Sequence, residues 1–120
     1  MAYTILIADD EAEIRQLLRL YLEKDGYEVM EAENGVEAME ILRQREIHLI
    51  LFDIMMPQLD GYQVLRKLRQ ESNIPVIFLS AKGADEDKIL GLDLGADDYI
   101  TKPFNPLEAM ARINAGIRRF

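Results

Sequence analysis

The sequence predicts a single α/β domain, residues 1–120, in which helices cover both faces of a parallel β-sheet. Three observations support this fold class. Apolar segments of strand length recur five times, amphipathic helical segments lie between them, and the connections are short. Because crossovers between parallel strands are right-handed, this alternation indicates a doubly wound sheet.

The expected strands differ in how their apolar residues are spaced. Segment 27–32 alternates, as an edge strand does. Segments 3–8, 49–53 and 76–80 are nearly continuous in apolar residues, and a shorter fifth segment spans 99–101. The three continuous segments are therefore expected to be covered on both faces.

Five helices are expected from apolar residues at helical spacing and from residues that begin or end helices. The first ends at Asp25-Gly26, Asn34 caps the second, Asp60 caps the third, the fourth spans 85–94 before Gly95, and Asn105-Pro106 opens the fifth. The apolar faces comprise Ile14, Leu17, Leu18, Tyr21 and Leu22; Val36, Met39 and Leu42; Tyr62, Leu65 and Leu68; and Leu107, Met110, Ile113 and Ile117.

Composition and charge exclude several classes of protein. A net charge of -8 argues against direct binding to nucleic acid. The absence of cysteine excludes disulfides and thiolate metal sites. The N-terminus lacks the pattern of a signal peptide, and no apolar run approaches the roughly 18 residues of a membrane span. We therefore expect a soluble cytoplasmic protein with no membrane partner.

Polar and charged residues follow four of the five expected strands. Asp9 and Asp10 follow the first strand, Asp53 ends the third, Ser80 the fourth, and Lys102 follows the fifth. Alone, each has an ordinary explanation as a helix-start acid, a strand-end cap, a turn residue or a solvated lysine. Because the carboxyl ends of parallel strands share one edge, their coincidence predicts a ligand site there.

This set of residue types suits phosphoryl transfer. Clustered carboxylates repel one another, and a hard cation such as Mg²⁺ offsets that repulsion. A carboxylate beside the metal can attack phosphorus and form an aspartyl phosphate. Lys102 and Ser80 can then contact the phosphoryl oxygens.

The motifs "ILIADDE", "LILFDIMMPQLDG", "VIFLSAK" and "GADDYITKPF" resemble, in order and spacing, those of receiver domains of two-component response regulators. The resemblance covers the whole chain. It implies a flavodoxin-like (CheY-like) sheet of order 2-1-3-4-5 with five helices. It also implies a signalling domain rather than an enzyme with turnover.

The resemblance also assigns roles to individual residues. Asp53 would accept the phosphoryl group from a sensor histidine kinase, with Ser80 and Tyr99 as switch residues and Lys102 on the phosphoryl oxygens. The implied Mg²⁺ ligands are Asp9, Asp10, Asp53 and the backbone carbonyl of Met55. The Lys102-Pro103 peptide bond would be cis.

The C-terminal third is similar to the OmpR/PhoB subfamily, whose members carry a DNA-binding effector domain after the receiver. We therefore expect DNA contact only through such a domain, which this chain lacks. Either the chain is trimmed at the linker, which we favour, or the protein is a stand-alone receiver. The subfamily implies a phosphorylation-favoured homodimer through the fourth helix, the fifth strand and the fifth helix. Its expected residues are Lys88, Ile89, Leu92, Asp93, Asp97, Asp98, Glu108, Met110, Arg112 and Arg119.

Other functions fit the sequence less well. A flavodoxin would offer hydroxyls and amides to phosphate where this chain has "DDEAE". A phosphatase would need an acid at the position of Met55. A receiver-like docking module would not need all the site residues.

Met55 and Lys82 favour slow loss of the phosphoryl group, and His48 is expected to be structural.

Overall fold

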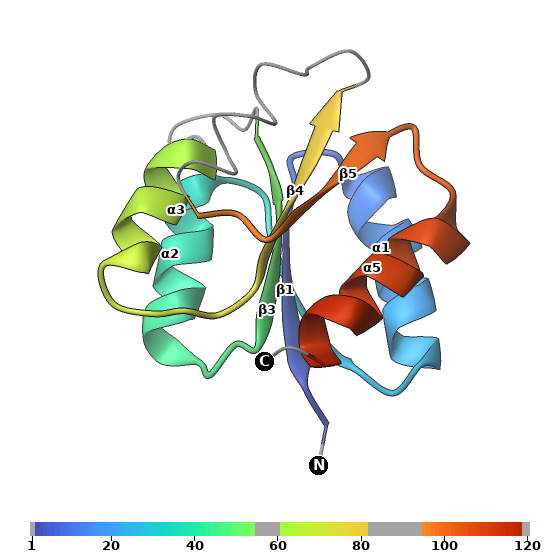
Figure 1. The fold of residues 1–120 in the computed structure, drawn as a ribbon, viewed down its shortest axis with the longest axis horizontal. Helices are drawn as coiled ribbons and strands as arrows, with labels where there is room; N and C mark the ends of the chain where they lie inside the picture. The colour runs from blue at the N-terminus through green and yellow to red at the C-terminus, as the bar shows by residue number, and fades with distance from the viewer. Residues whose placement is uncertain (1, 55–60, 82–94, 119–120) are drawn as a thin grey trace.

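The computed structural model describes residues 2–54, 61–81 and 95–118, which form one parallel sheet between two layers of helices (Figure 1). The strand order is β2-β1-β3-β4-β5. The strands are β1 (Thr4–Ala8), β2 (Glu28–Ala32), β3 (Leu49–Asp53), β4 (Val76–Ala81) and β5 (Asp98–Lys102). The predicted fold class and strand order are confirmed.

Among the described residues, two helices cover each face of the sheet (Figure 1). The described helices are α1 (Ala12–Lys24), α2 (Gly35–Gln44), α3 (Gly61–Arg69) and α5 (Pro106–Arg118). Helices α1 and α5 lie on one face, and α2 and α3 lie on the other (Figure 1). The range expected for a further helix, 85–94, lies outside the described residues, as does the expected cap Asp60.

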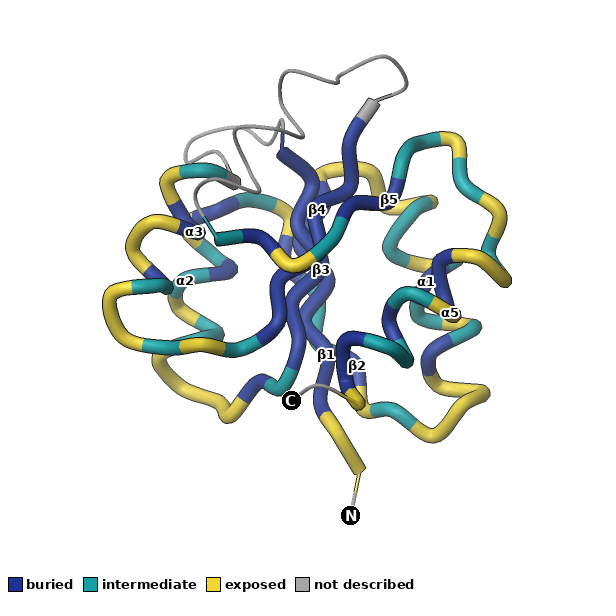
Figure 2. The backbone as a smooth tube through the Cα atoms, in the orientation of Figure 1, coloured by how far each residue is buried: buried dark blue, intermediate teal, exposed yellow. Residues whose placement is uncertain are grey.

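The strands form the buried centre of the molecule (Figure 2). All five residues of β1 and all five of β3 are buried, whereas in the edge strand β2 only Val29 and Ala32 are buried. Phe52 and Phe78 belong to the cluster on the α2/α3 face. Ile77 and Leu79 belong to the cluster on the α1/α5 face. The continuous apolar segments are therefore covered on both sides, as predicted.

The predicted helix ends are confirmed where the structure describes them. Asn34 Oδ1 accepts a hydrogen bond of 2.8 Å from the Glu37 amide, and Asn105 Oδ1 accepts one of 2.8 Å from the Leu107 amide. After α1, Gly26 has a φ of 90°, a conformation that favours glycine. These local signals set where the helices begin and end.

Two apolar residues expected on buried helix faces are exposed. Leu107 is 71% exposed and Val36 is 48% exposed. Both lie beside the buried stripe of their helix, which includes Gly35 and Ala38 in α2 and Ala109, Met110, Ile113 and Ile117 in α5. The expectation of burial is therefore wrong for these two residues, because the helix faces the sheet with neighbouring positions.

His48 has a structural role, as expected. Its Nδ1 accepts a hydrogen bond of 2.9 Å from the Thr4 amide, and its Nε2 lies 3.0 Å from Glu46 Oε1. These contacts connect the start of β1 to the loop before β3. In the part of the chain that the structure describes, no helix is both long and apolar enough to cross a membrane.

Candidate functional site

The carboxyl ends of the strands bring the predicted site residues to one edge of the sheet. Asp9 directly follows β1, Asp53 is the last residue of β3, and Lys102 is the last residue of β5. Ser80 lies in β4, one residue beyond Leu79, which is paired with Asp53. The Lys102-Pro103 bond is cis, as predicted.

The ammonium group of Lys102 lies at the centre of this edge. Its Nζ is 2.8 Å from Asp9 Oδ2, 3.1 Å from Asp53 Oδ2 and 3.4 Å from Glu11 Oε1. Asp9 is fully buried and Asp53 is 8% exposed. Lys102 therefore balances carboxylates that have little access to water.

The pKa values of this cluster reflect burial and pairing. Burial raises the pKa of Asp9, although the contacts with Lys102 and the Glu11 amide oppose the rise. Burial lowers the pKa of Lys102, but its interactions with Asp9 and Asp53 outweigh that effect, and the pKa stands above its ordinary value. Lys102 is therefore a cation at neutral pH.

Four carboxylates at this edge could hold a metal ion. Asp9, Asp10, Glu11 and Asp53 each offer an oxygen, and these oxygens lie within 4.8 Å of one another. An all-oxygen acidic set is the chemistry that Mg²⁺ prefers. The donor set therefore fits such a cation, while Met55, the other expected ligand, lies outside the described residues.

Ser80 is the polar group at this edge that most needs a partner. It is 2% exposed, and its Oγ has no hydrogen-bond partner among the described residues. A buried hydroxyl without a partner carries a desolvation cost of about 1–3 kcal/mol, which a ligand oxygen at the site would relieve.

Tyr99 is 8% exposed, and its ring lies 5.6 Å from that of Phe78.

Two residues of this neighbourhood were not predicted. Glu11 reaches Lys102, and the acidic run "DDE" was the signal for it. Arg15 donates a hydrogen bond of 2.7 Å to the Asp9 carbonyl and one of 3.0 Å to Glu31. It therefore joins α1 and β2 to the acidic edge, the edge of the sheet that carries Asp9, Asp10, Glu11 and Asp53. An arginine on a polar helix face gives no sequence signal for that role.

Several residues expected in a dimer interface make contacts within the chain. Arg112 Nη1 pairs with Asp98 at 2.8 Å, and its guanidinium lies 3.5 Å from Glu108. Asp97 pairs with Arg69 of α3 at 3.0 Å. Asp98 begins β5 rather than preceding it.

One expected dimer residue is placed differently. Met110 is 7% exposed and belongs to the core cluster between α5 and the sheet, because it shares the inward stripe of Ile113 and Ile117. It is therefore a core residue rather than the apolar centre of an interface. Lys88, Ile89, Leu92, Asp93 and Arg119 lie outside the described residues.

Comparisons with known proteins agree with this geometry. Residues 5–114 match the sequence profile of the response regulator receiver domain. The chain is 58% identical over 119 residues to response regulator GtcR of Aneurinibacillus migulanus, and 47% identical over 119 residues to transcriptional regulatory protein SrrA of Staphylococcus aureus. Each alignment covers 99% of this chain and 49% of the relative, so the chain spans about half the length of these curated relatives.

A solved structure shows the same similarity in three dimensions. The receiver domain of Francisella response regulator 1452 superimposes with a TM-score of 0.91 at 41% sequence identity. That superposition covers 98% of both chains.

Proposed function

The chain belongs to the response regulator receiver domain family, and on that premise we propose that Asp53 accepts a phosphoryl group from a sensor histidine kinase. The observation that carries the assignment is the position of Asp53 at the carboxyl end of the central strand β3. There its Oδ2 lies 3.1 Å from Lys102 Nζ, and the neighbouring strand β4 holds the Ser80 hydroxyl, which has no hydrogen-bond partner in the described part of the chain.

The proposed reaction is a transfer from nitrogen to oxygen. A carboxylate oxygen of Asp53 attacks the phosphorus of a phosphohistidine, a P–O bond forms, and the P–N bond breaks to return the imidazole to the kinase. Asp53 suits this role because it ends β3, the strand between β1 and β4, and is partly exposed, whereas Asp9 is fully buried.

The other site residues would stabilise the transferred group. The Lys102 ammonium, now shared among carboxylates, would contact a phosphoryl oxygen, and Ser80 Oγ would donate a hydrogen bond to another. Asp9 and Asp10 would hold Mg²⁺, with Met55 supplying a carbonyl. When bound, the metal neutralises charge on the phosphoryl oxygens.

The signal would leave the site through β4 and β5. Movement of Ser80 toward the phosphoryl group would repack Tyr99, which lies one strand away against Phe78. The outcome would be a homodimer through β5, α5 and the segment 85–94, and control of transcription in the cytoplasm through a C-terminal DNA-binding domain of OmpR/PhoB type. The names of the relatives GtcR and SrrA support a regulatory role.

Metal dependence tests the proposed chemistry. Incubation with acetyl phosphate should add one phosphoryl group in the presence of Mg²⁺ and none in EDTA, as read by intact mass. Asp10→Ala should strongly reduce the modification, whereas Glu13→Ala, which removes an exposed acid from the same helix start, should not. Undiminished modification in EDTA would contradict the mechanism.

Sedimentation tests the proposed dimer. At about 100 µM, well above ordinary dimer dissociation constants, the phosphorylated chain should sediment as a dimer and the unmodified chain as a monomer. Monomers in both states would refute the dimer proposal and leave the phosphorylation chemistry untouched.

A further inference from the structure

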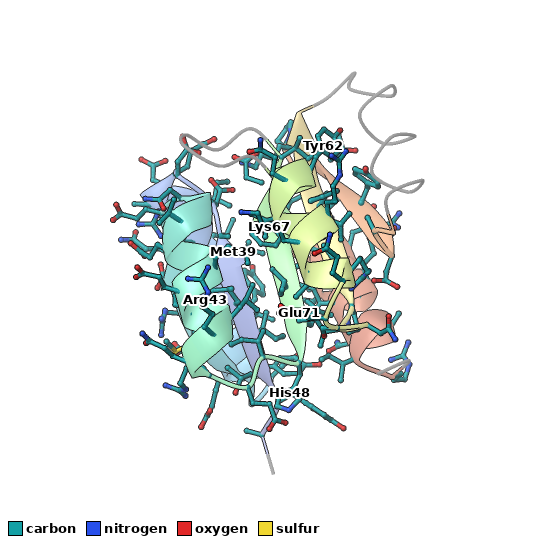
Figure 3. All side chains as sticks on the ribbon, turned by 90° about the vertical axis from the view of Figure 1, so that its left-hand side faces the viewer. Met39, Arg43, His48, Tyr62, Lys67 and Glu71 are labelled. Atoms are coloured by element: carbon teal, nitrogen blue, oxygen red, sulfur yellow. The ribbon has the colours of Figure 1, made fainter. Side chains whose placement is uncertain are left out.

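A groove runs between the last turns of α2 and α3, on the face of the molecule shown in Figure 3. It has a volume of about 560 Å³ and is bounded below by the segments that lead into β3 and β4. Because these helices run antiparallel to the strands, the groove lies at the end of the sheet opposite the acidic edge. None of the site residues described above lines it.

Five of the twelve residues that line the groove are apolar. Ile47 is 5% exposed and Leu68 is 7% exposed. Met39, Leu42 and Ile74 are half-buried and pack against the same core cluster. The lining therefore offers apolar surface to a partner without any rearrangement of the core.

Three exposed cations line this apolar surface: Arg43, Arg45 and Lys67. None of the three has an ion-pair partner among residues 2–54, 61–81 and 95–118. Of the other cations in the described part of the chain, Arg15, Arg19, Arg69, Lys102 and Arg112 are paired with carboxylates, and Lys24, Arg66 and Arg118 have no ion pair there and do not line the groove.

Helix dipoles account for only part of this arrangement. A cation near the carboxyl end of a helix is favourable, which explains Arg43 on α2 or Lys67 on α3 taken singly. It does not explain why a chain of net charge -8 leaves three cations unpaired around one apolar groove. The lining also holds two carboxylates, Glu71 and the largely exposed Glu46, which lies 3.0 Å from His48 Nε2, so three cations stand against two acids.

We propose that this groove docks an acidic amphipathic helix of a partner protein. The apolar stripe of that helix would lie on the half-buried Met39, Leu42 and Ile74. Its carboxylates would face Arg43, Arg45 and Lys67. A helix suits a groove between two helices, because its backbone groups are satisfied internally and only its side chains need partners. A small anion would gain nothing from the apolar floor, and a neutral peptide would gain nothing from the cations.

The test uses the unphosphorylated chain, so it is independent of the role proposed for Asp53. The probe is a synthetic helical peptide of about five turns, with leucine at i, i+3, i+4 and i+7 spacing and glutamate on its flanks. A control peptide carries lysine in place of every glutamate. Titration into the ¹⁵N-labelled chain, followed by NMR, should shift the amides that line the groove with the acidic peptide only.

Charge reversal provides the matched control. Arg43→Glu with Lys67→Glu should weaken binding of the acidic peptide by about tenfold or more, and added salt should weaken binding to the unmodified chain. Lys24→Glu with Arg118→Glu makes the same change in net charge on exposed, unpaired residues elsewhere and should change affinity by less than about twofold. Arg43→Gln with Lys67→Gln serves as the second variant if the charge-reversed protein does not fold.

Four results would overturn the proposal. One is no shift at millimolar peptide, and a second is equal binding of the acidic and basic peptides. A third is the same set of shifts from inorganic phosphate alone, which would make the groove a small-anion site. The fourth is self-association of the chain that the reversed pair abolishes, which would make a second copy the occupant.

Discussion

Replacing Lys102 with methionine tests whether its ammonium holds the acidic edge together. The change keeps most of the volume of the side chain but leaves Asp9, Glu11 and Asp53 facing one another without a cation. We expect the free energy of unfolding to fall at neutral pH when no divalent cation is present, because repulsion among buried carboxylates is then unopposed.

The size of the loss follows from the burial of the pair. Removing one partner of a buried ion pair costs about 3–5 kcal/mol, and an exposed pair contributes about 0–1 kcal/mol. Lys102 is 16% exposed and Asp53 is 11% exposed in their side chains, while Asp9 has no exposure. A loss of about 2–3 kcal/mol is therefore expected at this partly open edge.

Urea unfolding followed by circular dichroism measures the loss, which corresponds to a midpoint lower by about 1–2 M. The pKa of Lys102 is raised by its partners, so its contribution is present at neutral pH and is lost only as pH rises through that raised value. Burial raises the pKa of Asp9 above its ordinary 3.8, so its ion pair with Lys102 is lost as pH falls through that raised value, and the difference in stability between the two proteins should narrow there.

Magnesium should act more strongly on the variant than on the unmodified chain. At a concentration about a hundred times its dissociation constant, a bound cation adds roughly 2.7 kcal/mol, and the ammonium no longer competes with it. Lys24→Met, an exposed lysine without an ion pair in the described part of the chain, should leave the midpoint unchanged. A Lys102→Met protein as stable as the unmodified one at neutral pH without magnesium would refute the reasoning.

Two further changes test contacts near the amino ends of the strands, away from the site. Arg69 donates two hydrogen bonds to the Gly95 carbonyl, at 3.1 and 2.9 Å, and pairs with Asp97. Arg69→Ala should therefore lower the free energy of unfolding, measured in urea, by about 2 kcal/mol. A loss below about 0.5 kcal/mol would contradict this. Burial raises the pKa of Tyr27 above its ordinary 10.0, so the unfolded chain ionises first and stability falls as pH rises through that value. Tyr27→Phe should show a shallower alkaline decline between about pH 9 and pH 11, and an identical decline would argue against the shift.

The sheet could be predicted from sequence because the composition of each strand reflects whether its two faces are buried. Segment 49–52 is apolar throughout because helices cover both of its faces, and the structure places β3 over 49–53. Leu107 shows the limit of such reasoning. Its spacing matches that of Met110, Ile113 and Ile117, yet it is exposed while Ala109 is fully buried, because spacing alone does not give the exact direction in which α5 faces the sheet.

The position of the site could be predicted for a topological reason. Parallel strands end at one edge, so Asp9, Asp53 and Lys102 had to lie near one another once the strands were assigned. Which acids would reach the ammonium could not be predicted, because that depends on side-chain direction at the turn after β1. The contact of Glu11 with Lys102 and the pairing of Arg112 with Asp98 inside the chain are of this kind.

Intact-mass measurement of the Asp53→Asn protein tests the central claim most directly. After incubation with acetyl phosphate and Mg²⁺, the unmodified chain should gain the mass of one phosphoryl group, about 80 Da, and add close to two negative charges. Asp53→Asn should show no gain under the same conditions, while Asp25→Asn, an exposed aspartate at the far end of α1, should gain it fully. Full phosphorylation of the Asp53→Asn protein would contradict the account.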